Sequence, residues 1–102
     1  MDVVDRLAEV SGKVTTAVAA VNVDSAASPV LAAVVREFET KASKASRAAD
    51  KGPQAARDAV VELEQAGDSA KAAAEADPDA SEATRTAVLD AHLSICMLKA
   101  KL

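Results

Sequence analysis

The chain has 102 residues, a net charge of −4 and a single cysteine. This length predicts one domain, and the acidic balance argues against nucleic-acid binding, which needs a concentrated basic surface. One cysteine excludes an internal disulfide and any metal knuckle built from several cysteines. Abundant alanine, with only three glycines and three prolines, predicts an all-α chain.

The first predicted helix covers residues 2–21, where apolar residues recur at alternating spacings of four and three. This heptad spacing is typical of a helix in a bundle or a coiled coil. Its members are Val3, Leu7, Val10, Val14, Ala17 and Val21.

Two further helices are predicted from capping signals. Ser28 followed by Pro29 places a hydroxyl N-cap before a proline at the first helical position, so a helix is expected over residues 29–50. Gly52 and Pro53 then end that helix and begin a third over residues 53–76. Gly67 has two interpretations within the third helix: it lets another helix approach closely, or it splits the helix in two. We favour a continuous helix.

The fourth predicted helix covers residues 78–101. Asp77 and Pro78 repeat the pattern of a cap followed by proline, and Asp79 and Glu82 place negative charge near the helix N-terminus. Four helices of similar length with short connections predict an up-down-up-down antiparallel four-helix bundle that occupies residues 1–102 as a single domain.

The segment 88–102 carries apolar residues on two sides of its helix, at about 100° per residue. A helix that is apolar on both sides is usually buried on both sides. One set fits the core of the bundle: Val88, Ala91, Ile95, Leu98 and Leu102. The second set predicts an interface with another protein: Leu89, Leu93, Cys96, Met97 and Ala100. Leu98 and Leu102 are expected to be shared between the core and this interface.

The two-sided helix therefore predicts a small non-enzymatic module for protein–protein interaction or oligomerisation. The expected partner is a second copy of the chain in a homodimer, or another helical protein. A purely structural alternative places the fourth helix at the centre of the domain, with the other three helices around it.

His92 raises an alternative function. A lone histidine on a helix of a small bundle resembles the arrangement in histidine phosphotransfer domains, and the resemblance implies that His92 accepts a phosphoryl group. Those domains have a lysine and a small residue, usually glycine, in the turn after the histidine. Here the residues from Leu93 to Cys96 follow it, and the lysine comes only at position 99, so bulky side chains would crowd the phosphoryl group.

No cofactor or metal site is predicted. A di-metal site in a bundle needs inward Glu-x-x-His pairs, but the residue three positions before His92 is Leu89, and no carboxylate lies at the core positions. His92 and Cys96 form an i, i+4 pair in which thiol activation is geometrically possible. No third residue that would orient the pair can be identified from the sequence, so no catalytic residue is expected.

The remaining expectations concern location. The first residues lack a basic region followed by an apolar run, so no secretory signal is predicted. The apolar stretch at residues 14–23 is too short to span a bilayer. A cytoplasmic protein without membrane association is therefore expected.

Overall fold

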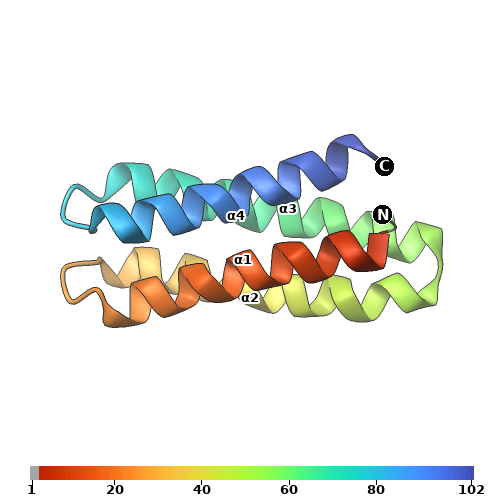
Figure 1. Cartoon of the computed structure of the whole chain (residues 1–102), viewed down its shortest axis with the longest axis horizontal. Helices are drawn as coiled ribbons and strands as arrows, with labels where there is room; N and C mark the ends of the chain where they lie inside the picture. The colour runs from red at the N-terminus through yellow and green to blue at the C-terminus, as the bar shows by residue number, and fades with distance from the viewer. Residues whose placement is uncertain (1–2) are drawn as a thin grey trace.

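The computed structural model describes residues 3–102, and they form an all-α antiparallel bundle (Figure 1). The predicted fold class is therefore confirmed. A short 3₁₀ turn, η1, extends the second helix. The elements are α1 (Val3–Val23), α2 (Pro29–Ala48), η1 (Ala49–Lys51), α3 (Pro53–Ala76) and α4 (Glu82–Ala100).

Each helix packs against two neighbours, in the pairs α1–α2, α2–α3, α3–α4 and α1–α4. The bundle measures 41 × 20 × 19 Å, and the α1–α2 and α3–α4 loops lie together at one end (Figure 1). α4 occupies a corner of this arrangement. The alternative with α4 at the centre is therefore wrong, and none of the other helices described over residues 3–102 covers the outer side of α4.

The heptad residues form the core, as predicted, except that Val3 is only partly buried against it. In α1 the spacing of four and three brings one face inward, and Leu7, Val10, Val14, Ala17 and Val21 are all buried. The same holds for the large residues on the inward faces of the other helices. They are Leu31, Val35 and Phe38 from α2, Val60 and Leu63 from α3, and Val88, Ile95 and Leu98 from α4.

Gly67 lies within an unbroken α3, so the continuous helix is confirmed. A Cβ atom built at this position would lie 3.1 Å from Cζ of Phe38 and 3.3 Å from Cγ2 of Ile95. Both side chains are completely buried. The absence of a side chain at Gly67 therefore lets the ring of Phe38, the only phenylalanine of the chain, pack against the α3 backbone.

Several predicted helix boundaries need correction. α1 continues to Val23, the regular part of α2 ends at Ala48, and α4 begins at Glu82 instead of residue 78. The N-cap of α4 is Ser81, whose Oγ accepts a hydrogen bond from the N–H of Thr84. The predicted start of the first helix at Asp2 lies outside the described residues.

Asp77 does not cap α4 because its carboxylate is hydrogen-bonded to the loop between α1 and α2. Oδ2 of Asp77 accepts a hydrogen bond of 2.7 Å from the backbone N–H of Ser28. In return, Oδ2 of Asp24 accepts a hydrogen bond of 2.8 Å from the backbone N–H of Ser81 and a second one of 2.7 Å from the hydroxyl group, Oγ1, of Thr84. These reciprocal bonds join the two loops at one end of the bundle and fix how α4 begins.

Candidate functional site

The outer face of α4 carries three large apolar side chains in contact with solvent. Leu93 is 58% exposed, Met97 is 53% exposed and Leu89 is 37% exposed. Ala100 is exposed beside them, at the last residue of the helix. The second apolar set of the sequence therefore lies mainly outside the core, on the face of α4 that α1, α2 and α3 leave uncovered.

Two residues differ from their expected places. Cys96 is half-buried, and its sulfur faces His92 at the α3 side of α4 instead of the centre of the outer face. Leu102 lies beyond the end of α4 and is 39% exposed. Leu102 is therefore not a core residue, whereas Leu98 is buried as predicted.

A groove between α1 and α4 adjoins the outer face. It has a volume of about 300 Å³, which is at the lower end for small-molecule sites. Leu93 and Met97 contribute its apolar wall. The charged residues that line it carry both signs, and they are Arg6, Glu9, Lys13 and Asp90.

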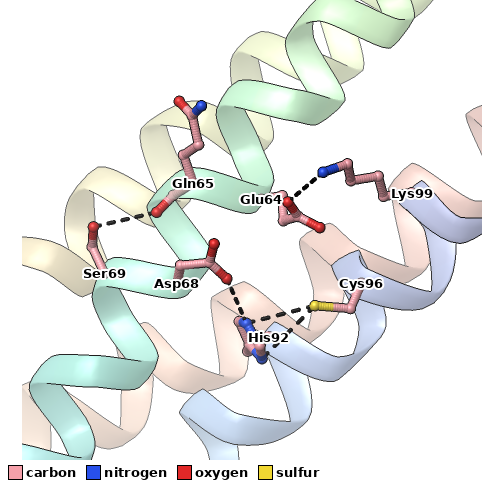
Figure 2. A network of polar contacts seen from close by, with 7 residues as sticks. All are labelled: Glu64, Gln65, Asp68, Ser69, His92, Cys96 and Lys99. Carbon is pink, nitrogen blue, oxygen red and sulfur yellow. Dashed lines mark hydrogen bonds and ion pairs between the residues drawn. The ribbon is translucent and has the colours of Figure 1, made fainter.

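A second group of side chains lies between α3 and α4 (Figure 2). Nε2 of His92 is 2.8 Å from Oδ1 of Asp68. The sulfur of Cys96 is 3.5 Å from Nε2 and 3.9 Å from Nδ1 of the same ring. The side chain of His92 is 16% exposed and that of Asp68 is 59% exposed, so solvent reaches the cluster from the Asp68 side.

The surroundings of Cys96 disfavour its thiolate. Burial raises the pKa of the Cys96 thiol, and the negative charges of Glu64 and Asp68 raise it further, more than Lys71 and Lys99 lower it. The thiolate is the nucleophilic form of cysteine. The pair of Cys96 and His92 therefore lacks the environment of an activated nucleophile, although the local field at the sulfur favours a cation.

Glu64 holds the next turn of α4 to α3. Its Oε1 lies 2.7 Å from Nζ of Lys99 (Figure 2). This hydrogen bond and the charge of Glu64 raise the pKa of Lys99. Together with the contact between Asp68 and His92, the pair fixes the register of α4 against α3.

Asp68 is the member of this cluster that sequence reasoning missed. It lies 24 positions before His92, on another helix, and nothing in the sequence states how far α3 is shifted along α4. The pair of His92 and Cys96 could be found because an i, i+4 spacing on one helix is local. The only other indication of a partner for His92 was the predicted antiparallel pairing of the third and fourth helices, which places them side by side.

The geometry does not favour His92 as a phosphoryl acceptor. A kinase needs access to a ring nitrogen, but Nε2 is hydrogen-bonded to Asp68 and the side chain is largely buried. The Asp68 carboxylate would also repel the incoming phosphoryl group, because both are negatively charged.

Comparison of the chain with known protein families, with curated proteins and with solved structures found no match. Among residues 3–102, no helix combines the length and the apolar character that crossing a bilayer requires.

Proposed function

We propose that the protein is a small non-enzymatic helical module that pairs with a second copy of itself through the outer face of α4. The observation that carries this proposal is the exposure of Leu93 and Met97, both more than half accessible on one face of one helix. Adjacent exposed apolar side chains are typical of interaction surfaces, because association removes their area from water.

The charges beside this face support a second copy as the partner. In a two-fold symmetric dimer the same patch occurs on both sides, so the patch must complement itself. The groove holds two cations, Arg6 and Lys13, and two anions, Glu9 and Asp90. Such a patch offers opposite charges to its own copy, whereas a partner of one charge sign would meet repulsion at half of these positions.

The size of the face limits the affinity. A stable specific interface buries about 800 Å² on each partner. Three large side chains on one helix cover less than this, so the groove on the α1 side must contribute to the contact. We therefore expect a weak dimer with a dissociation constant in the micromolar range.

The test is the molar mass in solution, measured by light scattering over a range of protein concentrations. The wild type is expected to approach twice the chain mass as concentration rises. The double variant Leu93→Glu/Met97→Glu is expected to remain a monomer with unchanged helix content. Val30→Glu is the matched control, because Val30 is 66% exposed on α2 but lies away from the α4 face, and it should dimerise like the wild type.

Two outcomes contradict the proposal. A wild type that stays monomeric at high concentration excludes the second copy and leaves a different helical protein as the partner of the face. A double variant that dimerises as strongly as the wild type shows that association uses another surface.

A further inference from the structure

The cluster of Asp68, His92 and Cys96 brings three kinds of metal-ligating atom together. A carboxylate oxygen, an imidazole nitrogen and a sulfur all lie within 4.8 Å of one another. Two of them come from α4, where an i, i+4 spacing places them one turn apart, and the third comes from α3. Among the described residues this is the group of three such side chains that has the spacing of a metal site.

The three ligand atoms are close enough to share one tetrahedral ion after side-chain rearrangement, without movement of the helices. Zinc lies about 2.3 Å from sulfur and about 2.0–2.2 Å from nitrogen or oxygen, so tetrahedral ligand atoms are roughly 3.4–3.6 Å apart. Cys96 Sγ lies 3.5 Å from His92 Nε2 but also 3.9 Å from Nδ1. The sulfur therefore lies beside the imidazole ring, and the ring must rotate to point the Nε2 lone pair at an ion shared with Cys96. Asp68 Oδ1 lies 2.8 Å from Nε2 and would have to move outward by about 0.6 Å on the same geometry. The side chain of Asp68 is more than half exposed and is free to make this shift.

We propose that Asp68, His92 and Cys96 bind one Zn²⁺ ion between α3 and α4. Zinc accepts mixed oxygen, nitrogen and sulfur ligands, whereas calcium and magnesium prefer oxygen alone. Three protein ligands leave a fourth position for water or an external ligand. The proposal is independent of the proposed dimer, since it concerns the α3 side of α4.

Binding changes the protonation of two ligands. The Cys96 thiol releases its proton to solvent and binds as the thiolate. Nε2 of His92 must bind zinc through its lone pair, so the neutral ring carries its proton on Nδ1. Asp68 exchanges its contact with His92 for a bond to the ion. The charge of the ion offsets the repulsion among Glu64, Asp68 and the thiolate.

The site also predicts an effect on stability. The ion joins two helices that are separate in sequence, so the unfolded chain holds no preformed site. Binding to the folded state alone raises the melting temperature. We expect Zn²⁺ to raise it by several degrees in the wild type.

The experiment uses the untagged full chain and zinc chloride in isothermal titration calorimetry. We expect one Zn²⁺ per chain with micromolar affinity or tighter. Each of Asp68→Asn, His92→Gln and Cys96→Ser should weaken binding at least tenfold and abolish the rise in melting temperature. Asp58→Asn is the matched control, because it removes the same charge as Asp68→Asn from an exposed position on the same helix, α3, and it should bind zinc like the wild type.

Titration with Co²⁺ identifies the ligands by spectroscopy. Tetrahedral cobalt with a thiolate ligand gives visible bands and a near-ultraviolet charge-transfer band, and Cys96→Ser should lose the latter. Absence of stoichiometric zinc binding by the wild type overturns the proposal. So does binding that survives Cys96→Ser unchanged, or that Asp58→Asn weakens as much as Asp68→Asn does.

Discussion

Asp24 shows how single carboxylates determine the geometry at one end of the bundle. Hydrogen bonds from the Ser81 backbone and the Thr84 hydroxyl lower the pKa of Asp24 from its ordinary value of 3.8 to about 2. Asp77 accepts from the Ser28 backbone, and this bond lowers the pKa of Asp77 as well. These hydrogen bonds are stronger to the ionised carboxylates than to the protonated groups, so the loop contacts depend on pH.

The sign of this dependence follows from the lowered pKa. The folded state favours ionised Asp24, so its contribution to stability is complete above about pH 4 and is lost as the pH falls towards 2. We expect the free energy of unfolding of the wild type to decrease over this interval. Asp24→Asn keeps the size and one acceptor oxygen but cannot ionise, and its decrease should be smaller. Denaturant titrations between pH 2 and 5 measure the free energy of unfolding of the wild type and of Asp24→Asn. Parallel pH profiles of the two proteins would contradict the assignment of this pH dependence to Asp24.

At the scale of helices, Gly67 sets the distance of α3 from its neighbours. Gly67→Ala gains up to about 1 kcal/mol of helix propensity. The new methyl group would meet the buried Phe38 ring at 3.1 Å, and overpacking a core costs about 1–3 kcal/mol. Because the ring is enclosed and cannot move freely, we expect Gly67→Ala to lower the free energy of unfolding by about 1 kcal/mol, as measured by chemical denaturation.

Gly12→Ala is the control for this prediction. A Cβ atom at Gly12 meets nothing within 4 Å, so the substitution should stabilise the protein by about 0.5–1 kcal/mol. Phe38→Leu should reduce the cost of Gly67→Ala, since it removes the atoms that the methyl group meets. Equal stabilisation by the two Gly→Ala changes would show that α2 and α3 separate without cost.

Over the whole molecule, stability depends on few large side chains. Phe38 is completely buried, and much of the remaining core consists of alanine and valine. Phe38→Ala should cost about 3–5 kcal/mol, which approaches the total stability of a small domain at about 5 kcal/mol. We expect a largely unfolded population by circular dichroism at room temperature. Phe38→Leu should remain folded, and a cooperative melt of Phe38→Ala near the wild-type temperature would refute this view of the core.

The sequence by itself determined the helices, their order and their inward faces. Heptad spacing is a local property, and Leu7 and Val14 were assigned to the core because the first helix presents one apolar stripe to its neighbours. Ser28 with Pro29 also marked a true helix start, since capping involves only adjacent residues. The similar signal at Asp77 and Pro78 failed, because the Asp77 carboxylate binds Ser28 in a loop 49 positions away.

Only the tertiary structure decided which side chains of α4 meet other helices. The exposure of Leu93 and Met97 depends on α4 occupying a corner of the bundle, and the sequence left a central position open. The cluster of Asp68, His92 and Cys96 depends on the axial shift between α3 and α4. That shift is fixed by packing at Gly67 and by the pair of Glu64 and Lys99, and such contacts between distant residues leave no periodic pattern in the chain.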